Sequence, residues 1–319
     1  MKILAIQNRM GIGDMVIFLP FIESIAENFN SPITLLVKES SKANEYIKNN
    51  NKINKIINLK RSNKNNGYHD GILGFLRLIK ELKKYSFDKV FIFNSSLRYY
   101  LICKLAGIKE IYQYPLFKKK EQNIIEAAKS LLLKKLNLKV ESNPRIFLEE
   151  NSIQKAKEKF NISDEKLNIL LGIGGSGPTK RIPSNKFIEL IKLTLNEYDC
   201  KFFLATGQGE DEQKILNEIN LSYNEKCVSL DKLSISEILP IIKNCRLAVC
   251  NDSSFSHFSA SLGLPTIVLM SDTPLLYGNY SPQMFPILPE GSKIVSHGTN
   301  GKEKINSEDI FKRLKTIIK

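Results

Sequence analysis

Short apolar segments alternate with helical segments along both halves of this 319-residue chain, and this pattern constrains the fold most strongly. Strands that alternate with helices of 10–15 residues predict parallel sheets with helices on both faces. We therefore predict two doubly wound α/β domains, residues 1–150 and 151–319, joined somewhere between residues 145 and 160. In such folds ligands bind beyond the carboxyl ends of the strands. The amphipathic C-terminal helix at residues 305–318 could pack back on the N-terminal domain.

The predicted elements are the following. Strands are expected at residues 3–6, 33–37, 53–59, 90–93 and 110–114 in the first half and at 167–172, 201–206, 227–229, 247–250 and 266–270 in the second. Helices are expected at residues 15–28, 41–49, 71–85, 101–107, 122–136, 153–160, 184–198, 212–219, 234–244, 255–262 and 305–318.

The net charge of +14 is unevenly distributed. Residues 1–150 carry 26 Lys and Arg against 14 Asp and Glu, a net +12, whereas residues 151–319 carry 21 against 19, a net +2. A lysine-rich base composition explains abundant lysine but not this asymmetry, so we expect an anionic partner for the first half. A nucleic-acid partner is not expected, because the sequence has no module that combines aromatic and basic residues.

Other bulk features predict a cytoplasmic protein. The five scattered cysteines have no metal-like spacing and suit buried free thiols in a reducing compartment. No leader is recognised at the N-terminus, and no apolar run approaches the roughly 20 residues that span a bilayer. We expect a monomer.

The turn that follows the apolar segment at 247–250 is the strongest candidate site. It places Asp252, Ser253, Ser254 and His257 at the start of a predicted helix. Free backbone N–H groups and the helix dipole at such a position favour a phosphate or diphosphate. An ordinary strand-to-helix turn is the alternative.

Two further loops follow predicted strands of the second half. Residues 172–183, GIGGSGPTKRIP, place Ser176, Thr179 and Lys180 where they could neutralise a diphosphate, although a solvated basic loop would look the same. Residues 205–212, ATGQGEDE, include Glu210 and Glu212, which could accept hydrogen bonds from ribose hydroxyls. An acidic first helical turn that matches the helix dipole is the alternative.

The first loop of the chain, residues 7–20, contains Gly11, Gly13 and Asp14. Asp14 is interpreted either as a general base facing a cleft or as a helix N-cap. Of the other histidines, His69 and His297 are expected to be exposed. No cluster has the spacing of a metal site, so no metal is expected.

Together the four loops resemble glycosyltransferase family 9, the lipopolysaccharide heptosyltransferases. The matching residues are Arg9, Gly11, Gly13 and Asp14; Thr179 and Lys180; the acidic residues at 207–212; and the segment from Asp252 to His257. Two positions depart from the family pattern: Ile182 replaces the usual tryptophan, and Ser254 replaces a glycine. Both departures bear on the identity of the donor.

The resemblance implies a GT-B fold, with an acceptor domain followed by a nucleotide-sugar domain across a cleft. It implies inverting, metal-independent transfer from ADP-heptose or a related donor, without a cofactor, to an acidic glycolipid at the inner face of the membrane. Asp14 would act as the base, with Arg9, Gly11 and Gly13 on the acceptor side. Lys180 and Thr179, with Ser176 and the N–H groups of Ser253 and Ser254, would hold the diphosphate. Glu212, or else Glu210, would contact ribose, and Asp252 and His257 would orient the donor. A relative that uses another donor and a non-catalytic binding protein are the competing hypotheses.

Overall fold

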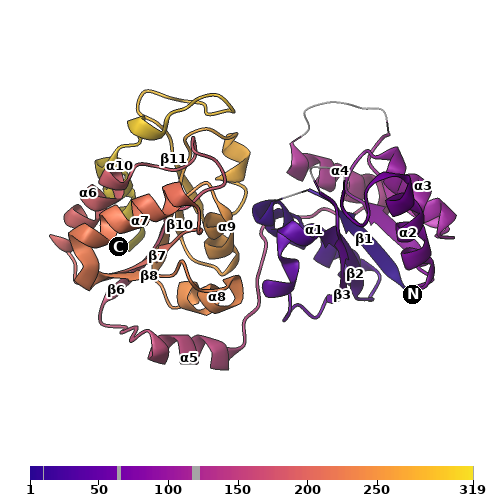
Figure 1. Ribbon diagram of the computed structural model, residues 1–319, viewed down its shortest axis with the longest axis horizontal. Coiled ribbons are helices and arrows are strands. Elements are labelled where there is room, and N and C mark those ends of the chain that lie inside the picture. The colour runs from indigo at the N-terminus through magenta and orange to yellow at the C-terminus, as the bar shows by residue number, and fades with distance from the viewer. Residues whose placement is uncertain (10, 63–65, 117–122, 319) are drawn as a thin grey trace. The chain divides into compact units, whose positions relative to one another are not determined.

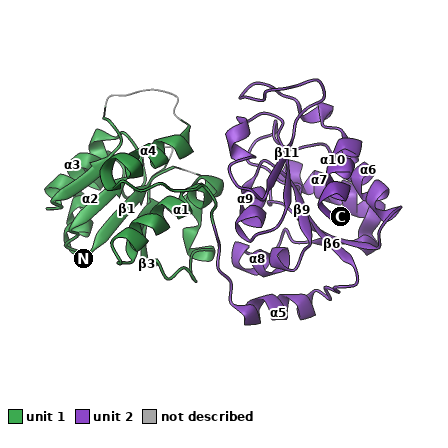
Figure 2. Ribbon diagram, turned by 180° about the vertical axis from the view of Figure 1, so that it is seen from behind, with its two compact units in different colours: residues 1–144 green, residues 145–319 purple. Residues whose placement is uncertain are grey.

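The protein divides into two compact units, residues 1–144 and 145–319 (Figure 2). The computed structural model describes residues 1–9, 11–62, 66–116 and 123–318. The division lies six residues before the boundary predicted at 150/151. Helix α5 (Glu150–Lys159) therefore lies entirely within the second unit.

The first unit contains one five-stranded parallel sheet in the order β3-β2-β1-β4-β5 (Figure 1). Its strands are β1 (Ile3–Gln7), β2 (Ile33–Lys38), β3 (Ile53–Leu59), β4 (Lys89–Ile92) and β5 (Glu110–Gln113). Its helices are α1 (Ile12–Asn28), α2 (Gly71–Lys83), α3 (Leu97–Leu105) and α4 (Ile124–Leu136). Helix α1 contacts α4, and α2 contacts α3, so that two helix pairs cover the sheet.

The second unit contains a six-stranded parallel sheet in the order β11-β10-β9-β6-β7-β8. Its strands are β6 (Leu167–Gly172), β7 (Cys200–Ala205), β8 (Cys227–Ser229), β9 (Leu247–Asn251), β10 (Thr266–Leu269) and β11 (Met284–Ile287). Besides α5, its helices are α6 (Ser184–Leu195), α7 (Glu210–Tyr223), α8 (Ile235–Lys243), α9 (Ser254–Ser261) and α10 (Ser307–Ile318). Both units are doubly wound, which confirms the predicted fold class.

The core of each unit consists of aliphatic and aromatic side chains from the central strands and the inner helix faces. All five cysteines are buried and free, as predicted. Burial raises the pKa of Cys103 to about 12, so its thiol stays protonated at neutral pH.

One prediction of local structure was wrong. Residues 41–49 do not form an α-helix. The chain instead forms two 3₁₀ turns, Glu39–Ser41 and Ala43–Glu45, which are separated by Lys42 at φ 50°. A residue in this left-handed conformation cannot continue a helix. The C-terminal helix α10 packs on α6 of its own unit, where Ile310 and Leu314 join the core. In the part of the chain that the structure describes, no helix is long and apolar enough to cross a membrane.

Candidate functional site

The strand order of the second sheet reverses between β6 and β9, the first strand of the unit and the fourth. At this point the loops after the two strands diverge, which leaves a crevice for ligands in doubly wound folds. The Asn251 side chain connects the two loops: its Nδ2 donates to the carbonyl oxygens of Ile173 at 2.7 Å and Gly174 at 3.2 Å. The predicted loops after residues 172 and 251 therefore meet at the switch point.

A buried ion pair lies between these two loops. Lys180 Nζ is 2.9 Å from Oδ2 of Asp252, and the Asp252 side chain is only 4% exposed. Burial alone would raise the pKa of Asp252. The positive charges of Lys180 and His257, together with hydrogen bonds from Thr273 and Lys180, outweigh burial and lower that pKa below its ordinary value. Asp252 is therefore a carboxylate at neutral pH, and it fixes the position of the Lys180 ammonium group.

His257 is held between Asp252 and a tyrosine that the sequence did not single out. Its Nδ1 lies 2.7 Å from the Tyr280 hydroxyl, and the two rings are stacked with centroids 5.6 Å apart. Burial raises the pKa of Tyr280 far above its ordinary value, so the hydroxyl keeps its proton. The other ring nitrogen of His257, Nε2, lies 4.0 Å from Oδ1 of Asp252. Tyr280 lies after β10, about twenty residues from the motif, where no sequence spacing connects it to His257.

The N-terminus of α9 lies in the same crevice. Ser253 is its N-cap by position, but its side chain makes no capping bond. Its Oγ is buried and lacks a hydrogen-bond partner among the described residues, as do Oγ1 of Thr206 and Oδ1 of Asn251. Buried polar atoms are normally satisfied, so orphaned ones indicate a place for a ligand or water. The first N–H groups of α9 add further free donors.

Glu212 connects the glycine-rich loop after β6 with the loop after β7. Its Oε1 accepts hydrogen bonds from the N–H of Gly175 at 3.0 Å and of Gly207 at 3.3 Å. The backbone passes so close that a Cβ at Gly174 would lie 2.6 Å from Oε1, and one at Gly207 would lie 2.5 Å from Oε2. A side chain at either position would therefore displace the Glu212 carboxylate from its present place. The glycine-rich loop is a packed structure around a carboxylate.

Glu212→Ala is expected to lower the free energy of unfolding by roughly 2 kcal/mol, because two backbone donors lose a charged acceptor. Glu210 is exposed in the same first turn of α7, so Glu210→Ala provides the matched control and should change stability by less than about 1 kcal/mol. Urea unfolding measures both variants. Equal losses would show that the carboxylates act only on the helix dipole.

The other predicted donor residues lie at different depths. The pKa of Asp272 is lowered, chiefly by a hydrogen bond from the Asn300 N–H. The Thr179 hydroxyl also donates to Asp272 and lowers this pKa further. Ser176 and Glu210 are exposed, and within the described residues no hydrogen bond or ion pair joins either to Asp252. The structure thus brings together Lys180, Asp252 and His257, with Ser253 and Ser254 beside them.

The two departures from the family pattern have different positions. Ile182 is fully buried in the core of the second unit, so the missing tryptophan affects packing there. Ser254 is the first residue of α9 and is half-buried. Of the two, only Ser254 lies at the N-terminus of α9, where the candidate site is.

Asp14 lies at the corresponding switch point of the first unit, after β1, which is flanked by β2 and β4. Helix α1 starts at Ile12 with Gly11 as its N-cap, so Asp14 is in the first turn and is not the cap. Its Oδ1 is 3.1 Å from Nε of Arg9, and both side chains are accessible to solvent, at 19% and 42% exposed. The N-cap interpretation is therefore wrong, and the carboxylate is instead paired with Arg9.

A second polar cluster of the first unit overturns the prediction that His69 is exposed. His69 is 2% exposed: its Nδ1 accepts from the Lys60 N–H at 3.0 Å, and its Nε2 lies 3.1 Å from Glu81. Burial leads the effects that lower the pKa of His69. His297, in contrast, is exposed as predicted.

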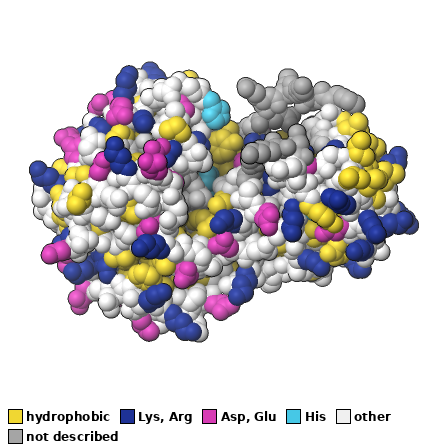
Figure 3. Space-filling model, in the orientation of Figure 1, with side chains coloured by type: hydrophobic (Ala, Val, Ile, Leu, Met, Phe, Trp, Pro, Cys, Tyr) yellow, Lys and Arg dark blue, Asp and Glu magenta, His cyan; other side chains and the backbone are white. Residues whose placement is uncertain are grey.

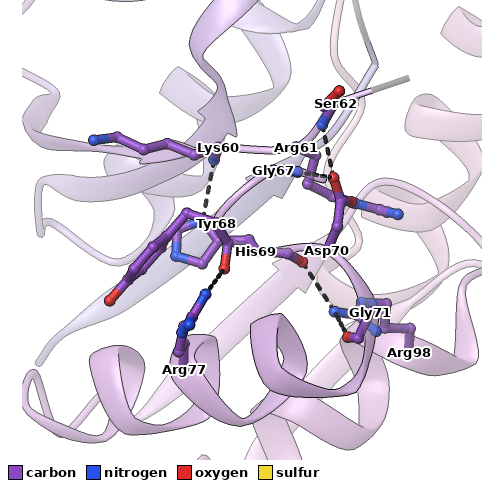
Figure 4. Close-up of polar contacts among 10 residues, drawn as sticks. All are labelled: Lys60, Arg61, Ser62, Gly67, Tyr68, His69, Asp70, Gly71, Arg77 and Arg98. Atoms are coloured by element: carbon purple, nitrogen blue, oxygen red, sulfur yellow. Dashed lines mark hydrogen bonds and ion pairs between the residues drawn. The ribbon is translucent and has the colours of Figure 1, made fainter. Parts of the chain in front are cut away.

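The neighbouring Asp70 explains why this loop is ordered around His69 (Figure 4). Asp70 accepts from the N–H groups of Ser62 and Gly67 and pairs with Arg61 at 2.7 Å. Although burial would raise the pKa of Asp70, these bonds lower it to about 2. The cluster joins residues 60–62, which follow β3, to residues 67–70, which precede α2. Over the described parts of the chain, no group of three His, Cys, Asp or Glu side chains is arranged to hold a metal.

Comparison with known proteins finds one matching family. The model of glycosyltransferase family 9 (heptosyltransferase) matches residues 75–315. Lipopolysaccharide heptosyltransferase 1 of Campylobacter coli is 27% identical over 178 residues, which are 53% of this chain and 52% of the relative. Lipooligosaccharide heptosyltransferase 2 of Haemophilus ducreyi is 27% identical over 134 residues, 40% of this chain and 36% of the relative. The matches thus span about half the length of these curated relatives, or less.

Solved structures share the fold over the whole chain. ADP-heptose lps heptosyltransferase II of E. coli superposes with a TM-score of 0.77 at 19% identity, covering 100% of this chain and 98% of that one. A family 9 glycosyl transferase of Veillonella parvula gives 0.81 at 19% identity, with 99% and 97% covered. At this identity the likeness shows the fold alone.

Proposed function

The chain belongs to glycosyltransferase family 9, and we propose that it transfers a heptose from ADP-heptose to a lipopolysaccharide-core or similar glycolipid acceptor by an inverting, metal-independent reaction. The Lys180–Asp252 pair beside the N-terminus of α9 carries this proposal, because it fixes positive charge where a departing diphosphate would lie.

Each group of the site then has a role. Lys180 and the N–H groups of Ser253 and Ser254 stabilise the leaving diphosphate, the charge that a metal balances in other transferases. Asp252 holds Lys180 in position, and His257, oriented by Tyr280, positions the donor.

Glu212 is our choice over Glu210 for the ribose contact. Both of its hydrogen bonds within the protein end on Oε1, so Oε2 is the oxygen that we assign to the ribose hydroxyls. The two bonds also hold the carboxylate in one orientation, which lowers the conformational cost of binding.

Asp14 serves as the general base. It takes the proton from the acceptor hydroxyl as that oxygen attacks the anomeric carbon, while the bond to the diphosphate breaks. Arg9 pairs with the same carboxylate and holds it in the first turn of α1. The excess of cations in residues 1–150 suits an acidic, phosphorylated acceptor and a peripheral contact with an anionic membrane at the cytoplasmic face.

ADP and ADP-heptose are expected to raise the melting temperature, by roughly 5 °C at a hundred times Kd, because a ligand that binds only the native state stabilises it. Differential scanning fluorimetry with ADP-, UDP-, GDP- and CMP-linked compounds tests this. A larger shift with another nucleotide would replace the heptose donor and retain the family assignment. If no nucleotide gives a shift, the donor site at the β6–β9 switch point is wrong.

A further inference from the structure

Helices α2 and α3 of the first unit expose large apolar side chains on their outer faces. The residues are 38–81% exposed: Ile72, Leu73, Leu76, Leu97, Leu101 and Leu105. In Figure 3 hydrophobic side chains gather on the first unit around α3, with Lys and Arg side chains next to them. We call these six residues the α2–α3 apolar surface.

The core does not need this surface. Leu78 and Leu82 on α2, and Tyr99 and Ile102 on α3, already bury the inner faces of the two helices. The three exposed leucines of α3 are four residues apart, so they form one stripe along the helix. Several large apolar side chains exposed on two packed helices indicate an interaction surface.

Cations line a hollow directly beside α2. Between β3 and α2 a groove of about 750 Å³ is lined by the basic residues Lys55, Lys60, Arg77, Lys80 and Lys84. Its one acidic lining residue, Glu81, is engaged by His69. Arg77 lies 4.6 Å above the ring of Tyr68 and Lys55 lies 4.6 Å above that of Tyr85, which holds both cations at the groove.

We propose that the α2–α3 apolar surface and this basic groove dock the first unit on a bilayer that contains anionic phospholipids. The aliphatic side chains enter the boundary between headgroups and acyl chains, and the groove cations bind lipid phosphates. Charge complementarity favours a bilayer as the partner. Lysines beside aliphatic side chains match a membrane whose anionic headgroups lie over an apolar interior. The proposal deepens the proposed function, on which it rests for the glycolipid acceptor.

Vesicle flotation of the full chain tests the docking without donor or acceptor. Vesicles of phosphatidylcholine with about 30% phosphatidylglycerol should bind the protein, and pure phosphatidylcholine should bind it much more weakly. Because each lysine near an anionic surface contributes about fivefold to partitioning, Lys80→Gln with Lys84→Gln should weaken binding roughly 25-fold. Leu73→Ser with Leu76→Ser should weaken it by at least tenfold.

Matched controls lie on α7 of the second unit, where Leu221 is 88% exposed and Lys214 is exposed. Leu221→Ser and Lys214→Gln should leave vesicle binding unchanged. The proposal is overturned if the protein does not bind anionic vesicles, if the control pair weakens binding as much as the α2 variants, or if only the lysine variants have an effect. Because the assay needs no nucleotide, a failed donor assignment would leave its result unchanged, and failed docking would leave the nucleotide shift intact.

Discussion

Asp14→Asn is expected to lower turnover about 10²–10⁴-fold, the usual contribution of a general base. Asparagine keeps an oxygen for the hydrogen bond with Arg9 Nε but cannot accept the proton of the acceptor hydroxyl. The change is nearly isosteric in an accessible first helical turn, so the melting temperature should shift by only a few degrees. Initial-rate measurements with saturating donor give kcat directly.

The control for this change is a carboxylate of the same unit outside the switch point. Asp88 accepts a hydrogen bond from the Lys2 N–H, at an exposed position before β4. Asp88→Asn should leave kcat within a factor of two to three. If Asp14→Asn retains a similar fraction of kcat, Asp14 is not the base. Nucleotide binding should survive the Asp14 change, because the donor site is built from residues of the second unit.

Much of the fold could be predicted because the central parallel strands are short apolar runs buried on both sides of the sheet. Ten of the described strands lie on predicted segments, although the edge strands β3, β5 and β8 are only partly buried. The exception, β11, contains Pro286 and is mostly half-buried at a sheet edge, so its pattern is weak. Likewise, nothing in residues 41–49 indicates that Lys42 adopts a left-handed conformation, which depends on how the chain leaves β2.

The candidate site could be predicted as a set of loops but not as a network. The sequence places polar residues after β6, β7 and β9, and parallel strands bring those ends together. It does not reveal that Glu212 binds two backbone N–H groups, or that Tyr280 stacks on His257, because both contacts are long-range. The burial of His69 was missed for the same reason: its partner Glu81 lies on the next helix.

The second large effect is expected for Lys180→Met. The substitution leaves the Asp252 carboxylate buried without its cation, and removal of one member of a buried pair typically costs about 3–5 kcal/mol. Thr273 and His257 still contact the carboxylate, so the lower end of this range is expected. Chemical unfolding at pH 7 gives the loss. Lys312→Met is the control, because Lys312 pairs with Asp309 and Glu308 at an exposed site and should cost less than about 1 kcal/mol.

The pH dependence of the same variant separates this cause from a simple packing defect. In the native protein the lowered pKa of Asp252 contributes stability above the ordinary value of 3.8, and this contribution is lost as the pH falls toward the lowered value. In Lys180→Met burial is no longer outweighed by the lysine, so the pKa of Asp252 in the folded protein rises above the ordinary value of 3.8. Protonation of Asp252 then stabilises the folded state of this variant. The loss of stability in Lys180→Met, relative to the native protein, should therefore become smaller as the pH falls from about 7 to about 5. At pH 7, adding Asp252→Asn to Lys180→Met should restore much of the lost stability. A deficit that is independent of pH and unrelieved by the second substitution would mean that Asp252 is not held as a buried carboxylate by Lys180.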